Sequence, residues 1–176
     1  RVHPTLIPER RLLANVDGVK NAVMVEGSAV GSTLYYGAGA GGDATASAVV
    51  ADVIDLARDL AAEQRPQIAS LGVAQQNIVA QTIVPMVQVV TPWYVRLEAE
   101  DRAGVMAQIT ALFSDEGISI EALIQKASSA GERKVPVIVL TTAAPQGRLD
   151  AVIAAMDKLE SIADDIMCIR VETLDV

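Results

Sequence analysis

An alternation of apolar and polar residues over 93–100 constrains the fold of this chain more than any other feature. A period of two is typical of a strand with one buried face. The segment therefore predicts a sheet whose covered side carries every second residue of this strand. That face consists of Trp93, Val95, Leu97 and Ala99.

The residues that follow extend this strand into a small domain. The turn at 101–104 leads into a helix that ends at Glu116-Gly117 and carries an apolar stripe of Val105, Ile109, Leu112 and Phe113. A strand, a hairpin loop, a strand, a helix and a strand are then predicted over 118–127, 128–132, 134–142, 149–159 and 166–173. The last strand is expected to bury Met167, Ile169 and Val171 on one face. The order is βαββαβ, the ferredoxin-like arrangement.

The first part of the chain predicts three strands and one helix. Apolar extended runs at 1–7, 21–26 and 32–36 favour strands. A helix is predicted over 44–60, with Asp43 or Thr45 as its N-cap and an apolar stripe of Val49, Val50, Val53, Ile54, Ala57 and Leu60. The segment 61–91 is interpreted as a connector with one or two short packed elements. The whole chain is therefore assigned to the α+β class.

Glycines gather in the turn that precedes this first helix. Gly37, Gly39 and Gly42 match the spacing G-x-G-x-x-G of dinucleotide-binding turns, in which the backbone approaches a pyrophosphate. Such a unit needs a second strand with an acidic residue about 20 residues later, and here that position falls inside the predicted helix. No Gly-Lys-Ser/Thr follows, which excludes a P-loop. The turn is therefore not a nucleotide fingerprint of its own. Without further information, a tight connection and a ligand contact are equally favoured.

Composition narrows the partners and the compartment. The net charge of −8 argues against nucleic acid and anionic membranes as partners, because both recruit basic surfaces. With only five aromatic residues, platforms for base stacking are also disfavoured. A single cysteine excludes an internal disulfide and favours a reducing compartment. The sequence contains no apolar run long enough to span a bilayer. The chain begins without methionine in strand-like sequence, so we expect it to be a piece of a longer protein.

No catalytic or metal-binding residue is predicted. His3 has no acidic partner at a recognisable spacing, so a structural role is favoured. Cys168 alternates with Met167 and Ile169, which predicts a packing or surface position. No histidine and cysteine cluster has the spacing of metal ligands.

The turn at 101–104 has two interpretations. Asp101 would serve as a helix cap in the simpler one, a role worth about 1 kcal/mol. In the other, the exposed N–H groups at 103–105 and the helix dipole attract the carboxylate of an amino acid. Asp101 or a strand of a neighbouring subunit would then take its ammonium group.

The predicted strand, Asp101-Arg-Ala-Gly104, the helix and Gly117-Ile-Ser-Ile120 together resemble an ACT domain, a small amino-acid-sensing module. The family pattern is D-R-P-G-x-L, from which Ala103 and Met106 depart. Proline only presets a helical φ, and methionine fills a similar volume, so neither change alters the physics.

The first part of the chain resembles the end of the catalytic region of homoserine dehydrogenases. The resemblance rests on Val2-His-Pro-Thr-Leu-Ile-Pro8, Asn21-Ala-Val-Met-Val-Glu-Gly27, Tyr36-Gly-Ala-Gly-Ala-Gly-Gly42 and Thr45-Ala-Ser-Ala-Val-Val-Ala-Asp52. It implies catalytic sequence over 1–60, a connector over 61–91 and an ACT regulatory domain over 92–176. Many bacterial members of this family have the same order.

The resemblance implies reduction of L-aspartate 4-semialdehyde to L-homoserine with NADPH or NADH, in the cytoplasm. The substrate-binding and proton-relaying residues of the family precede this chain, so it is expected to hold no catalytic residue. Cofactor contact is expected at Gly41, Gly39 and Thr45. The effector, expected to be L-threonine, would contact Asp101, Ala103, Gly104, Val105, Ile118 and Ile120. A homo-oligomer is implied, through ACT pairing and the catalytic-domain sheet.

A second class of function stays open at this point. Some ACT domains only mediate assembly, and a stand-alone ACT module would bind an amino acid or a protein without catalysis. An unrelated domain encoded upstream would favour that alternative. A nucleotide-binding strand, turn and helix upstream, followed by a lysine-bearing catalytic segment, would favour the dehydrogenase.

Overall fold

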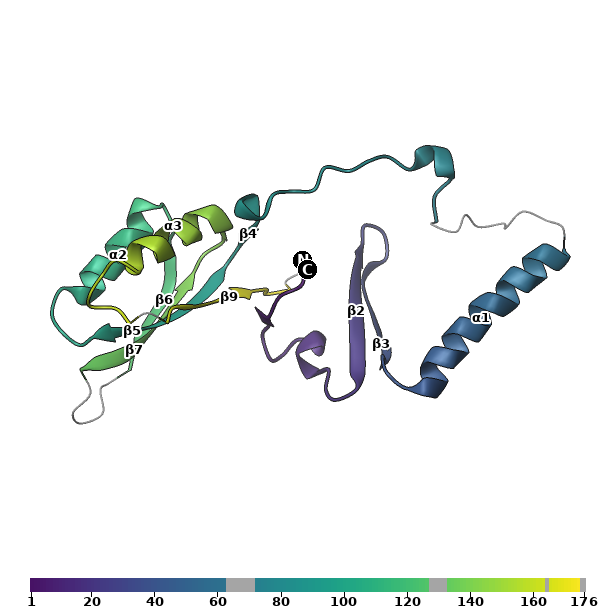
Figure 1. The fold of residues 1–176 in the computed structure, drawn as a ribbon, viewed down its shortest axis with the longest axis horizontal. Coiled ribbons are helices and arrows are strands. Elements are labelled where there is room, and N and C mark those ends of the chain that lie inside the picture. The colour runs from purple at the N-terminus through teal and green to yellow at the C-terminus, as the bar shows by residue number, and fades with distance from the viewer. Residues whose placement is uncertain (63–71, 127–132, 164, 175–176) are drawn as a thin grey trace. The chain divides into compact units, whose positions relative to one another are not determined.

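The computed structural model describes residues 1–62, 72–126, 133–163 and 165–174. The chain divides into two compact units (Figure 1). One, here called the C-terminal unit, comprises Ile83–Asp175 together with Arg1–Pro8. The other comprises Glu9–Thr82. The predicted hairpin loop at 128–132 lies outside the described residues. Within the described part of the chain, no helix is long and apolar enough to cross a membrane.

The C-terminal unit contains a five-stranded sheet in the order β1-β9-β5-β7-β6. The strands are β1 (Thr5–Leu6), β5 (Trp93–Glu100), β6 (Ile120–Gln125), β7 (Lys134–Thr141) and β9 (Met167–Val171). β5 pairs antiparallel with both β7 and β9, and β6 pairs antiparallel with β7. β1 pairs in parallel with β9, so the first residues of the chain join this sheet. The same unit also contains a short antiparallel pair of strands, β4 (Val90–Thr91) and β8 (Ala144–Pro145).

Two helices, α2 (Val105–Asp115) and α3 (Gln146–Met156), cover one face of this sheet (Figure 1). Burial alternates along β5 and β7 because every second side chain points toward the helices. The core between helices and sheet includes Val95, Leu97, Ile109, Phe113, Val137, Val139, Leu149, Val152 and Met156. The predicted βαββαβ order is confirmed.

The predicted buried face of the last strand is wrong. Met167 is 44% exposed, whereas Arg170 is buried and Cys168 packs against the core. The register explains the difference, because Cys168 lies opposite the buried Val95 and Arg170 lies opposite the buried Trp93. Residues directly opposite in an antiparallel pair share one face of the sheet.

The other unit contains a hairpin and a long helix. β2 (Lys20–Gly27) and β3 (Gly31–Ala38) pair antiparallel, and α1 (Gly42–Ala61) follows them. Short 3-10 turns lie at Leu12–Asn15 and Gln75–Asn77 in this unit, and another lies at Met86–Gln88 in the C-terminal unit. The helix α1 contains no buried residue. Its whole predicted apolar stripe is therefore exposed in the described part of the chain.

Candidate functional site

The glycine turn connects β3 to α1 and depends on two glycines for different reasons. Gly41 has φ 133°, a conformation that side chains other than glycine rarely adopt. A Cβ on Gly39 would overlap the side-chain amide of Asn21, so this exposed side chain would have to move to admit any other residue. The Gly39 N–H also donates to the Val19 carbonyl at 3.2 Å. Gly39 therefore has a packing role in the turn, in addition to any ligand contact.

The start of α1 offers open backbone. Gly41 is the N-cap and no side chain caps the helix, so the predicted cap at Asp43 or Thr45 is wrong. The Thr45 N–H instead donates to the Gly41 carbonyl at 3.1 Å. A Cβ on Gly41 or Gly42 would meet no atom within 4 Å. Ligand atoms can therefore reach the backbone here, although Asp43 places a negative charge in the first turn.

The second predicted site lies where β5 passes into α2. Gly104, at φ 93°, is the N-cap of α2, and no side chain caps the helix. The capping role considered for Asp101 is therefore wrong. Its Oδ1 instead accepts a hydrogen bond from Nε2 of Gln125 at 3.0 Å, at the end of β6. The structure thus adds Gln125 to this site, a residue without a local sequence signal because the contact joins residues 24 positions apart.

The six predicted effector residues divide into two groups. Asp101, Ala103 and Gly104 are exposed, and the N–H groups of Ala103 and Gly104 make no backbone hydrogen bond within the described residues. The side chains of Val105 and Ile118 are buried in the core, and Ile120 is half-buried against it. A ligand at this turn would therefore meet backbone donors and a carboxylate first, with the apolar residues supporting the turn from below.

Charge at this turn is mixed. The Arg102 Nε donates to Oε2 of Glu100 at 2.8 Å. This hydrogen bond holds the pKa of Glu100 below its usual value, and the positive charge of Arg102 adds to the effect. Both signs of charge therefore stand within four residues of Gly104.

The remaining candidates have structural surroundings. The Nδ1 atom of His3 lies 3.0 Å from Oγ1 of Thr5, its neighbour on β1. Burial, with Asp150 and Asp157 nearby, raises the pKa of the Cys168 thiol to about 11. Such a thiol is protonated at neutral pH and is a poor nucleophile. Among the described residues, no three histidine, cysteine or acidic side chains are grouped as metal ligands.

The fold defines this chain as a β-hairpin, turn and helix segment followed by a ferredoxin-like α+β domain. Comparison with known proteins agrees in both parts. A family model described as homoserine dehydrogenase matches residues 1–54, and one described as ACT domain matches residues 93–161.

Individual relatives match almost the whole chain. Homoserine dehydrogenase of Neisseria gonorrhoeae is 47% identical over 99% of this chain and 40% of the relative. That of Pseudomonas aeruginosa is 43% identical over 99% of this chain and 40% of the relative. The crystal structure of a homoserine dehydrogenase from Thiobacillus denitrificans matches with a TM-score of 0.88 and 47% identity, over 99% of this chain and 39% of that one.

The chain belongs to the homoserine dehydrogenase family and corresponds to a C-terminal portion of its members. It spans about 40% of the length of the curated relatives named above.

Proposed function

We propose that this chain is the cofactor-facing and regulatory part of a homoserine dehydrogenase, which reduces L-aspartate 4-semialdehyde to L-homoserine with NADPH or NADH in the cytoplasm. The observation that carries the proposal is the match to named homoserine dehydrogenases over 99% of the chain. The two family models lie in the order of a catalytic segment followed by a regulatory domain. This order favours the dehydrogenase over a stand-alone ACT module.

The glycine turn fits one wall of a nicotinamide cofactor site. Open backbone at Gly41 and the unpaired N–H groups at the start of α1 suit an anionic or carbonyl group of the cofactor. Gly39 keeps the turn tight against Asn21, and Thr45 adds a hydroxyl on the first turn of α1. When bound, the cofactor supplies the hydride. This chain's residues would orient it through backbone contacts and contribute no proton donor.

The turn at Asp101–Gly104 is the proposed site of an amino-acid effector, L-threonine. Free N–H groups at Ala103 and Gly104 would take its carboxylate, and Asp101, held by Gln125, would take its ammonium. Inhibition requires threonine to bind one conformation of the enzyme better than another, because equal affinity shifts no equilibrium. Pairing of two ACT modules within a homo-oligomer is the proposed element with two states.

The experiment joins this chain to the segment of the Neisseria gonorrhoeae relative that precedes the match. Oxidation of NADPH and of NADH is followed at 340 nm with L-aspartate 4-semialdehyde. We expect turnover that depends on the aldehyde, and the ratio of the two rates identifies the preferred cofactor. A soluble, folded chimera without activity would contradict the dehydrogenase assignment.

Two variants of the chimera separate the two sites. Gly41→Ala should raise the KM for the cofactor several-fold and leave threonine inhibition unchanged. Asp101→Asn should weaken threonine inhibition at least tenfold and leave the KM for the cofactor unchanged. The Gly37→Ala variant is the control for the first, because Gly37 has a negative φ and no atom within 4 Å of a Cβ. Unchanged inhibition in Asp101→Asn would remove this turn from the effector site.

A further inference from the structure

A buried arginine stands at the wall of a cavity between α3 and β9 in the C-terminal unit. Arg170 is only 9% exposed, and no carboxylate within the described residues forms an ion pair with it. Its Nη2 donates to Oε1 of Gln146 and to the sulfur of Met86, which are neutral acceptors. A buried charge without a counter-charge is costly, so an arginine in this position calls for an explanation.

Two donors in the wall have no acceptor. The Arg170 guanidinium stacks over the indole of Trp93, 4.7 Å from the ring centroid, which fixes both planes. The Nε of Arg170 and the Nε1 of Trp93 are buried and make no hydrogen bond. The Nη1 of Arg170 also makes no hydrogen bond within the described residues. Unlike Nε, it is not fully buried, so it remains open to solvent. Of these donors, only Nη1 is open to an oxygen acceptor in the cavity, because Nε of Arg170 and Nε1 of Trp93 have almost no accessible surface.

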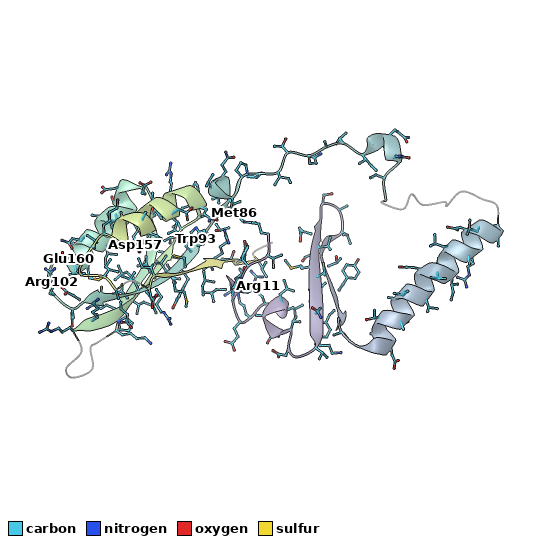
Figure 2. All side chains as sticks on the ribbon, viewed as in Figure 1. Arg11, Met86, Trp93, Arg102, Asp157 and Glu160 are labelled. Atoms are coloured by element: carbon cyan, nitrogen blue, oxygen red, sulfur yellow. The ribbon has the colours of Figure 1, made fainter. Side chains whose placement is uncertain are left out.

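The opposite charge lies at the rim of the same cavity, whose volume is about 450 Å³. Asp150 and Asp157 are exposed on and just after α3, and both act electrostatically on Cys168 in the cavity wall. Leu149, Ile153 and Ala154 supply an apolar side. The volume falls within the range of small-molecule sites. Met86, Trp93 and Asp157 can be located in Figure 2.

We propose that this cavity is a second amino-acid site, distinct from the turn at Asp101–Gly104. The ligand is a small aliphatic α-amino acid, whose carboxylate binds the guanidinium of Arg170. Its ammonium group faces Asp150 and Asp157, and its side chain packs on the apolar side. A plain dianion such as phosphate is disfavoured, because the two carboxylates at the rim repel it. The proposal stands independently of the dehydrogenase function.

Trp93 is the only tryptophan of the chain, so its fluorescence reports directly on this cavity. The chain is titrated with L-alanine, L-valine, L-threonine and L-isoleucine, and with propionate and propylamine as half-ligands. We expect a saturable change with at least one amino acid, and at least tenfold weaker binding of either half-ligand. Absence of a saturable change with every amino acid would overturn the proposal, and so would equally tight binding of propionate.

Variants at the cavity entrance test its location without disturbing the core. Ala154 is exposed and lines the cavity, whereas Ala151 is exposed on the same helix and does not. Ala154→Phe should weaken the amino acid at least tenfold, and Ala151→Phe should leave binding unchanged. Equal responses of the two variants would place the ligand elsewhere. Asp101→Asn should not change this fluorescence titration, which separates the cavity from the proposed effector turn.

Variants of the charged groups test the chemistry. Arg170→Lys keeps the charge but loses the planar fork, and should weaken the amino acid at least tenfold. The control is Arg96→Lys, on the exposed face of β5. The double variant Asp150→Asn with Asp157→Asn should weaken the amino acid about fivefold and strengthen propionate. If both ligands weakened together, the ammonium would not face these carboxylates. Far-UV circular dichroism and urea unfolding verify that each variant is folded.

Discussion

Helices α1 and α2 carry the same kind of apolar stripe, yet the structure treats them in opposite ways. Val105, Ile109 and Phe113 of α2 are buried against the sheet. Within the described residues, α1 buries nothing, and Val53 at the centre of its stripe is 58% exposed. Periodicity therefore tells that a helix has an apolar face, but burial needs a partner surface. Only the C-terminal unit supplies one within this part of the chain.

The largest expected effect is a truncation in each of the two stripes. Phe113→Ala should lower the free energy of unfolding by about 3–5 kcal/mol, because it leaves a cavity in the core. Val53→Ala should change it by less than about 0.5 kcal/mol, as exposed substitutions do. Urea unfolding followed by Trp93 fluorescence and by circular dichroism measures both. A loss above 2 kcal/mol for Val53→Ala would show that α1 is packed in solution and would break the contrast.

A buried hydrogen bond gives the next effect. The Trp93 backbone N–H donates to Oγ1 of Thr141 at 3.1 Å inside the C-terminal unit. Thr141→Val keeps the shape and removes the acceptor, which should cost about 1–3 kcal/mol. The neighbouring Thr142 is exposed, so Thr142→Val is the matched control and should be nearly neutral. Equal urea midpoints for the two variants would contradict the importance of this bond.

The two helix starts provide a smaller contrast. Gly104, the N-cap of α2, has φ 93°, whereas Gly42, the first residue of α1, has a negative φ, and a Cβ on either would meet open space. Gly104→Ala should destabilise the C-terminal unit by about 1–2 kcal/mol, because alanine is strained in that region. Gly42→Ala should be neutral or slightly stabilising. Thermal unfolding of the two variants measures the difference, and a neutral Gly104→Ala would contradict the described turn.

The last contrast concerns reactivity and leaves the fold unchanged. The raised pKa of the Cys168 thiol, about 11, leaves little thiolate at pH 8. We expect alkylation by iodoacetamide at least tenfold slower than at an ordinary exposed thiol, after allowing for the greater nucleophilicity of a more basic thiolate. A thiol introduced on exposed α1 by Ser47→Cys, in a Cys168→Ser background, is the comparison. The rate at Cys168 should rise steeply between pH 9 and 11 as the thiol ionises. Equal rates at pH 8 would show that β9 opens readily.

The raised pKa of the Cys168 thiol also makes the stability of the fold depend on pH in a definite direction. Its folded pKa lies above the ordinary value of 9.0, so the folded state holds the proton more tightly than the unfolded chain. Its contribution to stability is therefore complete below pH 9 and is lost as the pH rises toward 11.

Strands and helices with a clear apolar period could be predicted from the sequence, together with their buried faces, whereas the buried face of a strand without such a period could not. The strand at Trp93–Glu100 and the helix stripe of α2 were predicted because alternation and helical spacing each left one apolar face. Strand β9 was assigned the wrong face, because Met167, Ile169 and Val171 are more apolar than the residues between them. Burial of Arg170 depends on stacking over Trp93 and on neutral acceptors, none of which is local to β9.

The candidate sites follow the same division. The glycine turn and the turn at Asp101 could be predicted, because local backbone geometry favours glycines and acidic residues at such positions. The contact of Gln125 with Asp101 and the pairing of Arg170 with Trp93 appear only in the structure, because each joins segments that are distant in sequence.

By itself, the sequence determined the βαββαβ order, the apolar faces of its strongest elements, and the resemblance that led to the family. Those properties rest on spacing along the chain and on motifs read in order. Only the tertiary structure shows which face of β9 is buried, which donors lack acceptors, and that Arg170 lines the same cavity as Asp150 and Asp157. Such features depend on register and packing between distant segments, which no local period encodes.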